Sequence, residues 1–157
     1  MKIKIMKNVV VSFIIIIILT ACNYTSPFHN YSSNTEDLQI MPRTSMASTE
    51  SHTVIIGVDS TLWSMGNNEV GQLGCGTNLD RVFFNRVGID YGWSIVDTGW
   101  RHTVAIKYDG TLWAWGDNAT GQLGDGTRIR RYEPVKIGSD IDWVKIAASA
   151  SRTFAIK

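Results

Sequence analysis

The sequence predicts an all-β protein made of four-stranded antiparallel sheets, one for each copy of a repeat of about 50 residues. The first observation is internal similarity: segments 51–77 and 101–127 align without a gap and share sixteen of twenty-seven positions, and a further copy starts at Ser151. The second is local pattern, because short β-branched runs alternate with turn signals and show no helical period. Repeats of this length are typical of architectures in which stacked units share one core.

The first two strands of the second copy are expected at 102–108 and 111–116, with alternate side chains on opposite faces of the sheet. Between them, Asp109-Gly110 predicts a two-residue type I′ turn, which needs positive φ at both positions. The first copy has Asp59-Ser60 at this turn. Because serine tolerates positive φ less well than glycine, we expect the first hairpin to be weaker.

A polar loop follows at 116–127, and its glycines are expected to adopt positive φ in a folded-back chain. A strand is also predicted near 44–50, before the first full copy. Third strands are predicted at 85–89 and 133–137, and fourth strands at 93–98 and 143–148. The repeat region is therefore 44–157, with copies at about 51–100 and 101–150 and a partial third copy from 151.

The runs H-T-V-A-I-K-Y-D-G-T-L-W-A-W-G and G-Q-L-G-D-G-T resemble the repeat of the RCC1 family, the regulator of chromosome condensation. The resemblance covers roughly 44–157 and implies blades of a β-propeller. A ring closes with about four to eight blades, so about two blades would form an incomplete ring with open end faces. Three accounts stay open: a truncated piece of a longer chain, self-association that covers the open faces, or a small two-blade stack.

The N-terminal segment 1–21 has the pattern of a signal peptide, with three lysines before the apolar run 9–19. The motif Leu19-Thr20-Ala21-Cys22 resembles the lipobox of bacterial lipoproteins. That resemblance implies a diacylglycerol on the Cys22 thiol, and hence a lipid-anchored protein on the extracytoplasmic side of a bacterial cell envelope membrane. An uncleaved anchor and ordinary secretion are the alternatives. Residues 22–43, rich in Asn, Ser and Thr, are expected to form a flexible tether.

Charge and motifs limit the function classes. Without the first 21 residues the chain has twelve basic and fourteen acidic residues, so no nucleic-acid-binding surface is expected. His52 and His102 lack companion ligands at metal-binding spacing, and the glycine loops lack the Lys-Ser or Lys-Thr of a phosphate loop. No catalytic pattern stands out. The sequence therefore predicts neither an enzyme nor a cofactor nor a metal site.

Residues that depart from the repeat are the candidates for contact with a protein partner. Trp100 and Trp115 have no aromatic counterpart in the other copies, and Arg128, Arg130 and Arg131 form a basic cluster after Thr127. Core packing of the tryptophans and solvation of the arginines are the plainer alternatives.

The expected function is a lipid-anchored scaffold or protein-binding module with an unidentified protein partner. The alternatives are a non-functional fragment of a longer RCC1-repeat protein and a secreted enzyme inhibitor. The resembled family includes guanine-nucleotide exchange factors, but an exported lipoprotein does not meet cytoplasmic GTPases, so exchange activity is not expected.

Overall fold

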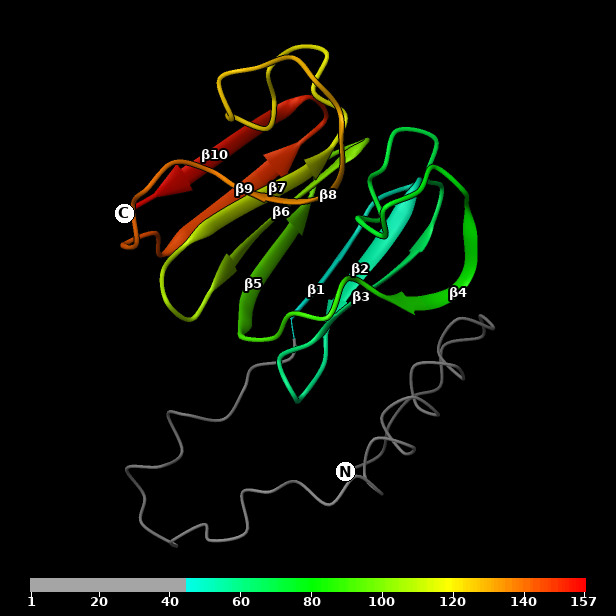
Figure 1. The fold of residues 1–157 in the computed structure, drawn as a ribbon, viewed down its shortest axis with the longest axis horizontal. Helices are drawn as coiled ribbons and strands as arrows, with labels where there is room; N and C mark the ends of the chain where they lie inside the picture. The colour runs from blue at the N-terminus through cyan, green and yellow to red at the C-terminus, as the bar shows by residue number, and fades with distance from the viewer. Residues whose placement is uncertain (1–44) are drawn as a thin grey trace, which may run out of the picture. The chain divides into compact units, whose positions relative to one another are not determined.

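The computed structural model describes residues 45–157, and every regular element in that range is a β-strand. The ten strands form two four-stranded sheets and one two-stranded sheet, all antiparallel and in chain order (Figure 1). The predicted all-β class with four-stranded antiparallel sheets is therefore confirmed. The predicted signal peptide, Cys22 and the predicted tether lie outside the described residues.

The first sheet contains β1 (Met46–Ser48), β2 (His52–Ile56), β3 (Leu62–Gly66) and β4 (Arg81–Arg86). The second contains β5 (Trp93–Thr98), β6 (His102–Lys107), β7 (Leu112–Gly116) and β8 (Arg131–Lys136). The third contains β9 (Lys145–Ser149) and β10 (Arg152–Ile156). In each sheet the strands pair in the order in which they occur in the chain.

The sheets are offset by one strand from the sequence repeat. The strand predicted as fourth in the first copy, 93–98, is β5, and it pairs with β6 of the following copy. The reason is the tight turn between them, in which the amide of Gly99 donates to the carbonyl of His102 at 2.9 Å. The expectation that one copy supplies all four strands of its own sheet is therefore wrong, and the third sheet has two strands rather than one.

The outer strands begin earlier than predicted. β4 starts at Arg81 rather than near residue 85, and β8 starts at Arg131 rather than 133. In both sheets the pairing register shifts before the last residue of the partner strand, so that Gly66 pairs with Arg81 and Gly116 with Arg131. Such a bulge extends the pairing beyond the apolar run from which the sequence prediction was made.

The hairpin turn differs from the predicted type I′ form. The amide of Gly110 donates to the carbonyl of Lys107 at 2.9 Å, and of the Asp109-Gly110 pair only Gly110 has positive φ, at 74°. This is a turn followed by one left-handed residue, which makes a three-residue loop. The first copy adopts the same turn with Ser60 at φ 61°. A non-glycine residue in this region carries backbone strain.

Two apolar layers hold the sheets together. Between the first and second sheets lie Ala47, Val54, Ile56, Leu62, Val87, Trp93, Val96, Ala105 and Trp115. Between the second and third sheets lie Val104, Ile106, Leu112, Ala114, Leu123 and Ile137, with partly buried residues of β9 and β10 against them. The inner strands of the second sheet, β5 to β7, are therefore covered on both faces, whereas Phe154 and Ile156 of β10 remain exposed on the outer face of the third.

Candidate interaction surface

The strand connections lie at two opposite ends of the sheets. The loops 67–80 and 117–130 lie at the same end (Figure 1). The short turns 49–51, 99–101 and 149–151 lie there too, since Asn67 donates to the carbonyl of Ser51 and Asp117 to that of Arg101, each at 2.8 Å. We call this set of loops and turns the loop end. The hairpins at 57–61 and 107–111 form the opposite end.

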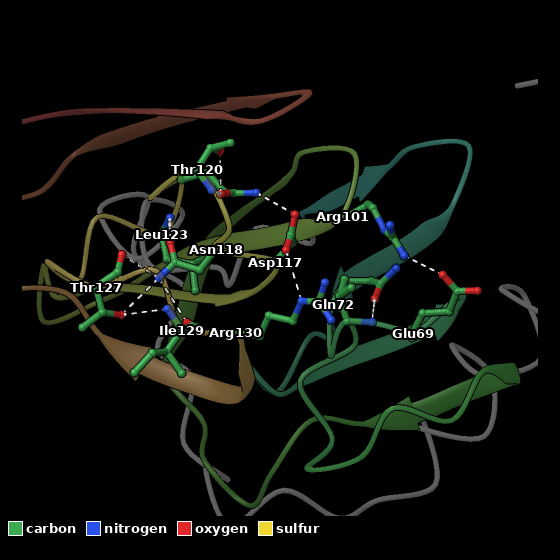
Figure 2. A network of polar contacts seen from close by, with 12 residues as sticks. Glu69, Gln72, Arg101, Asp117, Asn118, Thr120, Leu123, Thr127, Ile129 and Arg130 are labelled. Carbon is green, nitrogen blue, oxygen red and sulfur yellow. Dashed lines mark hydrogen bonds and ion pairs between the residues drawn. The ribbon is translucent and has the colours of Figure 1, made fainter.

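A buried asparagine organises each long loop. The side-chain amide of Asn118 donates to the carbonyls of Thr127 and Ile129 at 3.2 and 3.1 Å, and its oxygen accepts the amide of Leu123 at 3.0 Å (Figure 2). Asn68 makes the corresponding bonds in the first loop. Both side chains are fully buried. Sequence reasoning did not single out these asparagines, although their recurrence at the repeat spacing was a signal.

The predicted positive φ of the loop glycines is confirmed. Gly71, Gly74, Gly76, Gly121, Gly124 and Gly126 have φ values between 72° and 85°. The first loop also contacts the next sheet, because the amide of Gly76 donates to the carbonyl of Tyr132 at 2.9 Å. The loop surface is therefore held both from within and by the neighbouring sheet.

A histidine and a threonine connect neighbouring sheets. The Thr103 hydroxyl donates to the carbonyl of Gln72 at 2.8 Å, and it accepts from Nε2 of His52 at 2.8 Å. The same connection recurs fifty residues later, where Thr153 contacts His102 and the carbonyl of Gln122. These histidines therefore serve the packing of the sheets.

Burial, and then the charge of His102, lower the pKa of His52 to about 4, so the ring is neutral at pH 7. Burial lowers the pKa of His102 as well, against the opposing effect of Asp117 and Asp97. Within residues 45–157, no group of three His, Cys, Asp or Glu side chains is placed to hold a metal ion.

The three arginines of the predicted basic cluster have different surroundings. Arg131 is half-buried and contacts Asp125 at 2.7 Å. Burial alone would raise the pKa of Asp125, but hydrogen bonds from Thr127 and Arg131 outweigh it and lower the pKa to about 2. Arg130 lies 3.4 Å from Asp117, and Arg128 is exposed with no ion pair among the described residues. Arg128 and Arg130 therefore present charge to solvent, whereas Arg131 mainly holds the loop.

The two tryptophans that depart from the repeat also differ in their exposure to solvent. Trp100 is 60% exposed, and its backbone is fixed between neighbouring turns by bonds to Ala150 and Ser51. Trp115 is fully buried: its indole donates to the carbonyl of Gln72 at 3.0 Å and meets the ring of Trp93 edge-on at 6.0 Å. Trp115 is thus a core residue and offers no surface to a partner, contrary to its selection from the sequence.

The loop end also carries exposed apolar side chains. Leu79 and Ile129 occupy equivalent positions in the two long loops, and each is 61% exposed. The second of these lies between Arg128 and Arg130 in the sequence. Apolar and arginine side chains together are typical of protein-binding surfaces. Sequence reasoning missed this pair, although an apolar residue that recurs at the fifty-residue spacing was a signal.

Within residues 45–157 there is no helix of the length and apolar character needed to cross a bilayer. At the loop end an ion pair, Arg101–Glu69 at 2.5 Å, joins the turn before β6 to the first long loop (Figure 2).

Two family descriptions match the C-terminal part of the chain. Residues 109–156 and 93–122 each match a family description of the regulator of chromosome condensation (RCC1) repeat. No curated protein sequence matches the chain. Among solved structures, Prp20p from Saccharomyces cerevisiae is similar with a TM-score of 0.62 and 19% identity over 70% of this chain and 29% of that protein.

Two further structures give the same fold. Human WBSCR16 is similar with a TM-score of 0.62 and 21% identity, over 71% of this chain and 30% of that one. Yeast RCC1 (Prp20) in a structure with Kap60 gives 0.56 and 22%, over 66% and 25%. The chain thus spans less than a third of the length of these structures, and the sheets of residues 45–157 have the fold of the matching part of such a propeller.

Proposed function

Because residues 93–156 carry repeats of the RCC1 type, we propose that this protein is a lipid-anchored, protein-binding module of a bacterial cell envelope. The loop end is its contact surface, and Trp100, Arg128, Ile129 and Arg130 are the contact residues. The lipid on Cys22 holds the module at the membrane, and the chain performs no chemistry of its own.

The observation that carries the proposal is the contrast between rigid backbone and exposed side chains at the loop end. Asn118 fixes the loop from inside, while Ile129 and Arg128 point away from it into solvent. A pre-organised loop loses little conformational entropy on binding, which favours affinity. Loops held on a rigid scaffold are the usual place for binding residues.

The similar structures support binding as the class of function. Prp20p is described for its binding to Gsp1p and histones, and yeast RCC1 was solved bound to Kap60. Those partners belong to those proteins, and identities near 20% carry the fold alone. By analogy with those proteins, we propose that this chain also uses a propeller surface to bind a protein, here a protein of the cell envelope.

The contact surface is tested by site-specific photo-crosslinking in intact cells that express the full chain. A crosslinking phenylalanine analogue replaces Trp100 in one variant and Tyr108 in the control; Tyr108 is 58% exposed but lies at the opposite end. We expect discrete protein adducts from position 100 and none from position 108. Equal adducts from both positions, or none from either, would contradict the proposed surface.

The lipid anchor is tested separately. Cells grown with a clickable fatty acid should label the wild-type chain and leave Cys22→Ser unlabelled, with the variant retained as an unprocessed precursor. Labelling of Cys22→Ser equal to wild type would show that the thiol is not the attachment point. This outcome would leave the crosslinking result intact, so the two parts of the proposal fail independently.

A further inference from the structure

The strand connections opposite the loop end form a second surface, which we call the hairpin end. It consists of the hairpins 57–61 and 107–111 and the connections 87–92 and 137–144. The amide of Trp93 donates to the carbonyl of Ser60 at 3.1 Å. The amide of Tyr108 donates to the carbonyl of Gly92 at 2.9 Å, so the connection between β4 and β5 lies between the two hairpins.

The hairpin end carries exposed apolar side chains. They are Ile89 at 86% exposure, Tyr91 at 75%, Tyr108 at 58%, and Val58 and Ile141. Ile89 and Tyr91 lie between the first and second sheets, and Tyr108 follows β6 in the second sheet, which has a sheet on either side. The exposure of these three side chains therefore belongs to the end of the stack and not to an uncovered sheet face.

The chain enters the sheets at the same end. The amide of Ile56, the last residue of β2, donates to the carbonyl of Ser45 at 2.8 Å. Because the hairpin 57–61 follows β2 directly, Ser45 lies at the hairpin end (Figure 1). Cys22, on which we propose the lipid, precedes this point in the sequence. The part of the chain that carries the proposed lipid thus joins the sheets at the hairpin end.

The charges at the hairpin end balance within the described part of the chain. Five aspartates lie on its connections: Asp59, Asp90, Asp109, Asp140 and Asp142. Five bases stand at the adjoining strand ends: Arg86, Lys107, Lys136, Lys145 and Lys157. Lys107 pairs with Asp90 at 2.8 Å. This surface therefore neither strongly repels nor strongly attracts anionic lipid, and apolar contact is the force available for binding to a bilayer.

We propose that the hairpin end docks on the phospholipid bilayer, with Ile89, Tyr91 and Tyr108 in the interfacial region. Tyrosine suits this region because its ring is apolar and its hydroxyl is polar. A flexible tether of the predicted length would let either end of the sheets approach the membrane, so the orientation comes from these side chains. The loop end then faces away from the membrane, where a partner can reach it. The docking deepens the proposed function and rests on its lipid anchor.

The test adds the full acylated chain to vesicles of phosphatidylethanolamine and phosphatidylglycerol. The vesicles contain a phosphatidylcholine with a photoactivatable diazirine in its acyl chain, and mass spectrometry of the digested protein measures lipid adducts. We expect hairpin-end peptides to carry at least about fivefold more adduct than peptides with Trp100 or Ile129, whose exposure in the free protein is similar to that of Tyr108.

Matched variants test the two tyrosines. Tyr91→Asp with Tyr108→Asp should reduce the hairpin-end adducts at least about fivefold, whereas Tyr91→Phe with Tyr108→Phe should keep them. Leu79→Asp changes a side chain of similar exposure at the loop end and should leave the adducts unchanged. Hydrogen exchange of β6 checks that each variant is folded. Wild-type adduct levels in the aspartate variant would overturn the docking.

Flotation of the same vesicles distinguishes the docking from the lipid anchor. If the chain floats with the vesicles but both ends carry equal adduct, or neither carries any, the docking is wrong and the anchor stands. If the chain does not float, the anchor is wrong and the docking with it. Neither result bears on the partner contacts of the loop end.

Two further outcomes concern what the hairpin end contacts. Vesicles without phosphatidylglycerol should give the same adducts, because the charges at this end balance. Loss of the adducts would mean electrostatic binding and would contradict apolar docking. Discrete protein adducts from position 108 in the cellular crosslinking experiment would show that a protein covers this surface, and the proposal of a bilayer would be wrong.

Discussion

Asn118 illustrates how one buried side chain determines the shape of a long loop. Its amide and carbonyl replace main-chain partners that a glycine-rich segment cannot supply for itself. The histidine–threonine pairs do the same between sheets, since Nε2 of each buried histidine ring meets a threonine hydroxyl from the next sheet. Single polar residues thus determine the course of the long loop and the position of one sheet against the next, which the apolar layers alone do not determine.

Replacement of Asn118 by alanine should destabilise the protein by about 2 kcal/mol or more, because buried main-chain groups lose their partners. Asn78→Ala, at an exposed position of the first loop, is the control and should change stability by less than about 0.5 kcal/mol. Urea denaturation measures both. Equal effects would show that the loop does not depend on the buried amide.

Stability should fall as pH decreases from 7 to 4.5. The pKa of His52 is about 4 in the folded state and near 6.5 in the unfolded state. Between these two values the unfolded chain binds a proton that the folded chain does not, so the free energy of unfolding decreases as the pH falls. The loss attributable to His52 is on the order of 2 kcal/mol, and above pH 6.5 the contribution is constant. His52→Gln keeps a donor towards Thr103 and should reduce the slope in urea denaturation at a series of pH values. An unchanged slope would contradict the assignment to this ring.

At the scale of elements, the strands within the repeat could be predicted from alternation, and β5 matches its predicted range of 93–98. The grouping of strands into sheets could not, because neighbouring strands have similar patterns and only the short turn at Gly99 decides the pairing. The turn type was wrong because Asp-Gly suits both a two-residue and a three-residue loop.

Trp115 was misread for a related reason. Its counterpart in the first copy is Met65, which is half-buried on the outer face of the first sheet. The residue type at this repeat position therefore differs because the second sheet has a sheet packed against this face and the first sheet does not. A comparison of the two sequence copies shows that the residues differ, but it cannot show that a neighbouring sheet covers Trp115.

Ser60→Gly should stabilise the first hairpin by about 0.5–1 kcal/mol, because Ser60 adopts φ 61° and glycine has no Cβ penalty there. The reciprocal change Gly110→Ser should destabilise the protein, since Gly110 has φ 74° and its Cβ would collide with the carbonyl oxygen of Ile141. Thermal unfolding of the two variants gives the signs. A loss of stability in Ser60→Gly would refute the strain at this turn.

At the scale of the whole described unit, the sheets differ in how much of them is covered. The second sheet has an apolar layer on each face, and β6 is buried from His102 to Ile106. β2 buries alternate residues only, and β10 is half-buried at best. Stability should accordingly be highest in the middle of the stack and lower at its two ends.

Hydrogen exchange of the full chain should show this gradient. Amides of β6 should exchange slowest, and those of β10 should exchange at least about tenfold faster, because fewer buried contacts must break to expose them. Trp115→Ala should cost about 3–5 kcal/mol and reduce the protection of both the first and second sheets. Equal protection of β6 and β10 would mean that the outer faces are covered in solution.

The link between sheets also bears on how such a chain changes in length. Each fifty-residue copy supplies hydrogen-bonding groups for both of its neighbours. Thr103 bonds to the copy before it, and His102 and Gln122 bond to the copy after it. A duplication or deletion of fifty codons in register would therefore add or remove one sheet and keep the hydrogen bonds between the sheets that become neighbours. A change in the number of sheets by recombination needs no compensating substitution at these hydrogen-bonding residues.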